Sequence, residues 1–297
     1  MKSIKYTILF SLLAYTAAVT GQETTITETL PVGLKINSIT VEPAAMEFSI
    51  GRNYRQLRVT GQLESGQIAD LTRMLSIRKM PQHVQISADG IVTPISIGQE
   101  TVTLRFGKHS ATLAVSVKAL DLPTSSFVND VQPILAKMSC NAGTCHGSKD
   151  GKNGFKLSLR GYDPLYDHRA LTDDIGARRF NRAAPDQSLL LLKAVGAIPH
   201  VGGVRTTVDS RYYGIIRDWI TQGGRLDLET RKASSIEIFP KNPIIPRAGM
   251  KQQISVLATF PDGSMRDVTR EAFIESGNIE VIDADERGVL TLLRRGE

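Results

Sequence analysis

Cysteine is scarce in this chain of 297 residues, which contains only two. Both fall within residues 140–145, and His146 follows the second directly. So few thiols exclude a disulfide-rich scaffold, and they leave a structural zinc site without the second cysteine pair that four-ligand coordination needs. The cysteine chemistry of the protein is therefore confined to one short segment.

Several function classes also lack their sequence signals. There is no Gly-x-Ser-x-Gly motif, and residues 147–153 depart from a phosphate-binding loop because no Ser or Thr follows Lys152. The net charge of +6 is small for this length, and no basic helix is interleaved with aromatic residues, so we expect no nucleic-acid partner. No catalytic constellation is recognisable, which leaves open whether the protein is an enzyme.

Long apolar runs are missing beyond the first residues of the chain. Lys2 and Lys5 precede an apolar run over residues 6–14, and small residues follow up to Gly21. This pattern predicts a signal peptide over residues 1–21 and export to a periplasmic or cell-surface location. After its removal we expect no stable membrane span.

The segment Cys140-Asn141-Ala142-Gly143-Thr144-Cys145-His146 supports three interpretations. Two thiols followed by an imidazole suit covalent haem attachment, although the usual spacing between the cysteines is two residues and here it is four. A Cys140–Cys145 disulfide stapling a surface loop is the second interpretation. A metal site built from two thiolates and His146 is the third and the weakest, since structural zinc takes four protein ligands.

Two helices are predicted on either side of this motif. Ser125-Ser126 is a plausible N-cap for a helix that leads into Cys140, with apolar residues at helical spacing and Pro133 as a potential kink. A second helix begins at Asp209-Ser210 and ends at Gly223-Gly224. The apolar faces of the two helices comprise Phe127, Val131, Ile134, Leu135 and Met138 in the first, and Tyr212, Ile215, Ile216, Trp219 and Ile220 in the second.

Residues from about Phe127 to Gly224 resemble the planctomycete-type cytochrome c-like domain, which occurs in large secreted proteins. The likeness rests on four pieces in the same order: residues 140–147, Asn153-Gly154-Phe155-Lys156-Leu157-Ser158-Leu159-Arg160-Gly161-Tyr162-Asp163-Pro164, Pro199-His200-Val201-Gly202-Gly203, and Trp219-Ile220 ahead of two glycines. It covers about a third of the chain. The resemblance implies that Cys140 and Cys145 hold haem c and that His146 is the proximal ligand of its iron.

The distal ligand departs from the usual pattern, because no methionine lies between Met138 and Met250. His168 and His200 are the remaining imidazoles of the segment. We favour His200, which lies shortly before the final helix and beside two glycines that let the backbone pass near the ring. His168 is expected in a solvated loop or at a helix start. An open, five-coordinate iron is the remaining possibility.

A repeated β pattern lies on both sides of this segment. Short apolar-polar alternations over residues 34–120 indicate a β-sandwich, and Ser38-Ile39-Thr40-Val41-Glu42-Pro43 returns as Ser235-Ile236-Glu237-Ile238-Phe239-Pro240 at an offset of 197. Both copies resemble bacterial group 2 immunoglobulin-like domains. We therefore predict a multi-domain α and β protein: two all-β immunoglobulin-like sandwiches, at 34–120 and truncated at 232–297, flanking a small mostly α cytochrome c-like domain at 122–228. The incomplete second copy suggests a fragment of a longer protein.

These features favour an exported c-type haem protein that serves electron transfer or redox sensing at the cell envelope. Its expected partners are an unidentified redox protein and a cell-surface polymer or protein. The alternative is a haem-free surface-interaction module, in adhesion or polysaccharide association, with the disulfide formed. A third hypothesis makes the haem the electron-transfer part of a larger enzyme.

Overall fold

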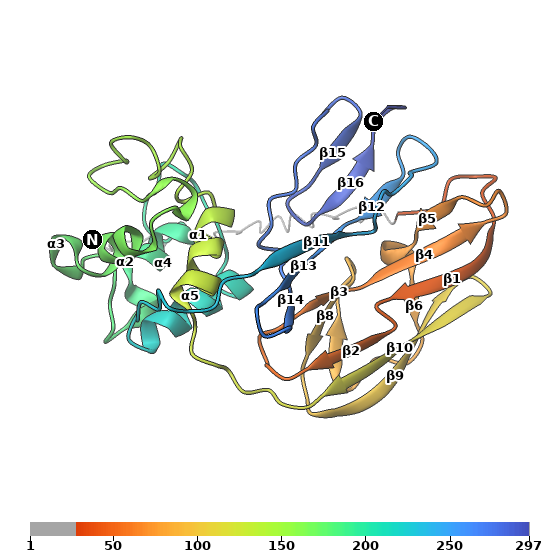
Figure 1. Ribbon diagram of the computed structural model, residues 1–297, viewed down its shortest axis with the longest axis horizontal. Coiled ribbons are helices and arrows are strands. Elements are labelled where there is room, and N and C mark those ends of the chain that lie inside the picture. The colour runs from red at the N-terminus through yellow and green to blue at the C-terminus, as the bar shows by residue number, and fades with distance from the viewer. Residues whose placement is uncertain (1–27, 297) are drawn as a thin grey trace, which may run out of the picture.

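The computed structural model describes residues 28–296 and divides them among two β units and a helical segment (Figure 1). The predicted signal peptide, residues 1–21, lies outside the described residues. Strand is the commonest regular structure, with 28% of the described residues in strands and 19% in helices. Its strands form several small sheets, none with more than four strands among the described residues.

The first β unit builds three sheets around one apolar core. Their strand orders are β1-β4-β5, β2-β10-β9-β6 and β3-β8-β7, and β2 pairs parallel to β10 whereas the other pairs are antiparallel. Along β9 and β10, alternate residues such as Leu104 and Leu113 are fully buried, as a half-buried strand requires. The elements are β1 (Ile36–Glu42), β2 (Ala45–Phe48), β3 (Arg55–Gln56), β4 (Arg58–Leu63), β5 (Ile68–Asp70), η1 (Thr72–Met74), β6 (Ser76–Ile77), β7 (Val84–Ile86), β8 (Ile91–Pro94), β9 (Gly98–Phe106) and β10 (His109–Val117).

The second β unit reproduces two of these sheets. The order β11-β13-β14 corresponds to β1-β4-β5, and β12-β16-β15 corresponds to β3-β8-β7. Gln56 and Gln253, which are 197 residues apart, each use Nε2 to bind the carbonyl oxygen of the next residue. The strands are β11 (Ser235–Phe239), β12 (Lys251–Gln253), β13 (Ser255–Thr259), β14 (Met265–Asp267), β15 (Ile282–Ala284) and β16 (Val289–Leu292).

The two β units pack directly against each other through a reciprocal pair of hydrogen bonds. The backbone N–H of Gln56 donates to Asp267 Oδ2 at 2.6 Å, and the backbone N–H of Gln253 donates to Asp70 Oδ2 at 2.5 Å. Both carboxylates are buried. Because residues 197 apart exchange roles, the contact has an approximate two-fold character; we call these two bonds the carboxylate clasp.

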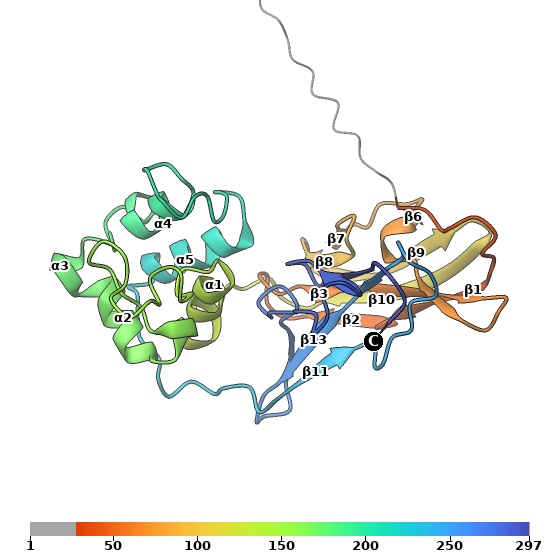
Figure 2. The same ribbon diagram turned by 90° about the horizontal axis from the view of Figure 1, so that it is seen from above.

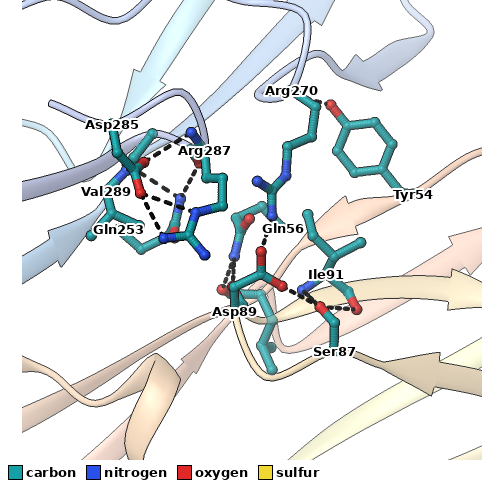
Figure 3. Close-up of polar contacts among 12 residues, drawn as sticks. Tyr54, Gln56, Ser87, Asp89, Ile91, Gln253, Arg270, Asp285, Arg287 and Val289 are labelled. Carbon is teal, nitrogen blue, oxygen red and sulfur yellow. Dashed lines mark hydrogen bonds and ion pairs between the residues drawn. The ribbon is translucent and has the colours of Figure 1, made fainter. Parts of the chain in front are cut away.

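Figure 3 shows the polar contacts that surround this interface. The guanidinium of Arg270, in the second unit, forms an ion pair with the Asp89 carboxylate of the first. The Tyr54 hydroxyl accepts a hydrogen bond of 2.8 Å from the Arg270 amide. Since these groups are partly or wholly removed from water, their pairing is needed to offset desolvation.

The helical segment surrounds one apolar core, centred on Trp219 and Phe127. The predicted second helix is confirmed as α5, where Ser210 Oγ accepts from the Tyr213 amide and Gly223-Gly224 follow the end. The predicted first helix is divided near Pro133 into a π-turn and a short α-helix. The elements are η2 (Phe127–Val131), α1 (Gln132–Lys137), η3 (Leu159–Gly161), α2 (Pro164–Thr172), α3 (Asp174–Ala177), η4 (Pro185–Gln187), α4 (Leu189–Ala194) and α5 (Arg211–Thr221).

The predicted fold class is wrong in two respects. The β units do not flank the helical segment; they lie together, and the helical segment lies to one side of them (Figure 2). No small, mostly α domain is evident either, because helices and helical turns cover less than half of residues 122–228. The repeat pattern could not show that its buried carboxylates bind the other copy, and the Gly- and Pro-rich stretches of the middle segment form long loops.

Residues 265–273 join all three parts, and we call them the junction segment. Glu271 accepts a 2.7 Å hydrogen bond from the Tyr54 hydroxyl and forms an ion pair with Arg211 at the start of α5. Arg266 pairs with Asp130 of the π-turn at 2.7 Å. The junction segment therefore fixes the helical segment against the β units.

Candidate functional site

The cysteine motif lies in a tight turn at the C-terminal end of α1. The Cys140 amide donates to the Leu135 carbonyl at 2.9 Å, and the His146 amide donates back to the Cys140 carbonyl at 3.0 Å. The four residues between the cysteines are thus folded into the turn. A Cβ at Gly147 would lie 2.0 Å from the Asn141 carbonyl oxygen, so this position admits only glycine without backbone movement.

Both cysteines are free thiols in this turn. Cys140 packs against the apolar core of the helical segment. Burial raises the pKa of its thiol to about 12, and a charge on Cys145 acts in the same direction, whereas Arg205 opposes them. Cys140 is therefore protonated at neutral pH, which disfavours thiol–disulfide exchange in the folded protein.

His146 is held with one ring nitrogen free. Its Nδ1 donates to the Phe155 carbonyl at 3.0 Å, and its ring packs on the Phe155 ring with 4.5 Å between centroids. A donor proton on Nδ1 leaves the lone pair on Nε2, the tautomer that metal-binding imidazoles adopt. Burial lowers the pKa of His146, despite the Phe155 hydrogen bond, and the nearby His200 and Arg179 lower it further.

His200 faces His146 across the site. Its Nδ1 donates to the Gly203 carbonyl at 3.0 Å, so its free nitrogen is again Nε2. The two imidazole planes differ by 6° and their centroids are 6.4 Å apart. Two imidazoles that bind one metal ion from opposite sides have centroids roughly 6 Å apart, because each metal–nitrogen bond is about 2 Å. The centroid spacing matches that distance, but the two rings are stacked, so each Nε2 lone pair lies in its own ring plane and the rings must turn before both nitrogens face one ion.

His168 lies elsewhere and has a different role. It belongs to α2, where its Nε2 donates to the Gly224 carbonyl at 2.7 Å. Its ring packs edge-on against Phe127 and Trp219, with centroids 5.2 and 5.9 Å away. His168 is thus half-buried on a helix and not in a solvated loop, and it ties α2 to the end of α5.

Two polar groups beside the motif were not anticipated from the sequence. Asn141 is buried, and its Nδ2 has no hydrogen-bond acceptor among the described residues. Arg205 influences the Cys140 thiol, and one of its guanidinium nitrogens lies, like the His200 ring, next to Gly202. Within residues 28–296 Arg205 forms no ion pair. The Asn141 N–H group without an acceptor and the Arg205 guanidinium without an ion-pair partner both suit a ligand that carries hydrogen-bond acceptors or carboxylates.

A haem and a bare metal ion take different sets of ligands from a protein. No group of three or more His, Cys, Asp or Glu side chains in the described part of the chain is arranged to hold a metal. A haem iron takes only two axial ligands from the protein, and the thiols serve the macrocycle instead. Cys140, Cys145, His146 and His200 lie near one another, and Asn141 and Arg205 lie beside them.

Comparison of the chain with protein-family models and with curated proteins found no match. The resemblance in residues 127–224 therefore stays a prediction. Between residues 28 and 296, none of the helices has both the length and the apolar character required to cross a bilayer.

Proposed function

We propose that this is an exported protein that binds one haem c through thioethers from Cys140 and Cys145, with His146 and His200 as axial ligands, and that it serves electron transfer or redox sensing at the cell envelope. The observation that carries the proposal is the pair of parallel imidazoles, 6.4 Å apart, each with Nε2 free. The likeness to planctomycete-type cytochrome c-like domains adds support from the sequence.

The residues of the site would perform distinct tasks. A haem bound there supplies an iron that accepts and releases one electron. The Phe155 and Gly203 carbonyls hold both imidazoles in the ligating tautomer. Arg205 is available to bind a haem carboxylate, and Asn141 Nδ2 to donate to an acceptor on the ligand. Two imidazoles, with no thioether sulfur, favour a lower reduction potential than a His/Met pair.

The proposal is tested on the full chain produced with export and c-type maturation machinery. We expect a red protein whose Soret band stays with the polypeptide after denaturation and acid-acetone extraction. Cys140→Ala and Cys145→Ala should each weaken this retention, because one vinyl group is left unreacted. Ser188→Ala, which alters a buried polar residue outside the motif, is the control for general damage. Full retention in both cysteine variants would contradict the thioether assignment.

The same purified protein also distinguishes the proposed haem protein from the haem-free alternative. A colourless protein with Cys140 and Cys145 joined would favour the haem-free surface-interaction module. Mass spectrometry distinguishes the two cases directly, because the mass rises by one haem or falls by two hydrogens.

A further inference from the structure

The surface around the two imidazoles has a strong excess of positive charge. Two segments contribute to it, residues 140–160 and 187–208, which together contain six basic side chains and one acidic side chain, Asp150. Lys152 is close enough to His146 to lower its pKa, and Arg205 is close enough to lower the pKa of Cys140. The excess charge therefore belongs to the site and is not spread evenly over the protein.

The cations near the two imidazoles have no acidic partner among the described residues. Lys149, Lys152, Lys156, Lys193 and Arg205 form no ion pair with any described residue. Other unpaired cations occur elsewhere in the described residues, so what distinguishes these five is that they lie in two segments with only one acidic side chain between them. Unpaired cations around one site produce a potential that attracts a negatively charged partner.

Exposed apolar side chains lie among these cations. Val201 and Val204 flank the His200 loop and are 101% and 64% exposed, and Leu159, next to Gly143, is 53% exposed. A protein interface commonly has an apolar centre and a polar, charged rim. An acidic polysaccharide offers little to cover three apolar side chains, whereas an acidic protein surface supplies both kinds of contact.

We propose that this surface is the docking site for an acidic partner protein, which places carboxylates on Lys149, Lys152, Lys156 and Lys193 and apolar side chains on Val201 and Val204. The inference rests on the proposed function, since a partner seated here would cover the ligand loops of His146 and His200. Its long-range attraction speeds encounter, and its apolar centre adds contact area.

The test uses the full chain and a fluorescent 18-residue peptide of repeated Glu-Glu-Leu as the probe. We expect saturable binding by fluorescence anisotropy at low salt, weakened at 0.5 M salt because exposed charges are screened. The triple variant Lys149→Glu/Lys152→Glu/Lys156→Glu should bind about tenfold or more weakly, because three exposed attractions are lost and the reversed charges repel the peptide. Val201→Ser/Val204→Ser should weaken binding severalfold at both salt concentrations.

The matched control is Lys35→Glu/Lys79→Glu/Lys108→Glu, which makes the same charge change on exposed residues of the first β unit. Equal loss of affinity in the control would show a general charge effect and overturn the proposal. Two competitors are added to the peptide complex: polygalacturonate with the same number of carboxylates, and vesicles with one fifth phosphatidylglycerol. The proposal is overturned if either displaces the fluorescent peptide as well as unlabelled peptide does. Visible absorbance of each sample reports haem loading separately, so a haem-free protein that binds the peptide refutes only the proposed function.

Discussion

Replacing Asp267 by alanine should destabilise the packing of the two β units. Asp267 accepts hydrogen bonds from the Gln56 amide at 2.6 Å, from the Thr269 amide at 3.0 Å and from the Thr269 hydroxyl at 2.7 Å. Alanine leaves the two buried amides without an acceptor, and each such loss costs about 1–3 kcal/mol. The hydroxyl can rotate toward another acceptor. We therefore expect the free energy of unfolding to fall by about 3–4 kcal/mol.

The reciprocal geometry of the carboxylate clasp provides a second, independent measurement. Asp70 accepts from the Gln253 amide at 2.5 Å and from the Thr72 amide at 2.8 Å, so Asp70→Ala should cost a similar amount. Urea unfolding followed by far-UV circular dichroism gives both values. Asp262→Ala removes an exposed carboxylate of the same unit and should change the stability by less than about 1 kcal/mol. If both clasp variants unfold like the wild type, the β units do not pack together in solution as described.

Three further predictions concern the site itself. His200→Ala should open the sixth position of a bound haem, shifting the iron toward high spin and allowing carbon monoxide to bind, whereas His168→Ala should lower stability without changing the spin state. Electron paramagnetic resonance measures the spin state and a thermal melt measures the stability. A spin change in His168→Ala would make His168 the ligand in place of His200. In haem-free protein, alkylation of Cys140 should be about tenfold or more faster after unfolding, because burial raises the pKa of the folded thiol to about 12 and more thiolate forms once the chain unfolds, even though the thiolate becomes less nucleophilic as its pKa falls. Equal rates by peptide mass spectrometry would show that the fold does not shelter the thiol. The pKa of His146 is lowered in the folded state, so the unfolded state binds more protons below the ordinary histidine pKa of about 6.5, and haem-free protein should lose stability as the pH falls through that value. Urea unfolding midpoints measured at pH 7, 6 and 5 should fall less in His146→Gln than in the wild type. The same pH dependence of the midpoint in both proteins would exclude the effect.

The sequence predicted the local elements better than their arrangement. The apolar spacing of Ile215, Ile216, Trp219 and Ile220, with Ser210 before it, led directly to α5, because periodicity and capping act within a few residues. The offset of 197 between repeats also indicated equivalent strands. It gave no sign that the repeats bind each other, because the Gln56–Asp267 contact joins residues that are 211 positions apart.

At the site too, residues close in the sequence were grouped correctly, whereas some contacts between distant residues were not foreseen. Cys140, Cys145 and His146 lie within seven residues of one another, so the sequence alone placed them together. His200 was proposed from the lack of methionine and from its place before α5, and its role as a ligand stays a prediction. Arg205 carried no motif, and its importance appears only when the fold brings it beside Cys140. His168 was misplaced, because a histidine on a helix gives no sequence sign that it will bond to a distant carbonyl such as that of Gly224.

The junction segment has a consequence for how the molecule tumbles. Tyr54 donates to Glu271 and accepts from the Arg270 amide, while Arg211 and Asp130 anchor the helical segment to the same stretch of chain. Braced in this way, the helical segment cannot reorient on a linker, and all three parts should share one rotational correlation time. If the proposed function holds, a redox partner meets the imidazole pair in one fixed orientation relative to the β units, so its productive encounters depend on rotation of the whole molecule and not on motion of the helical segment alone.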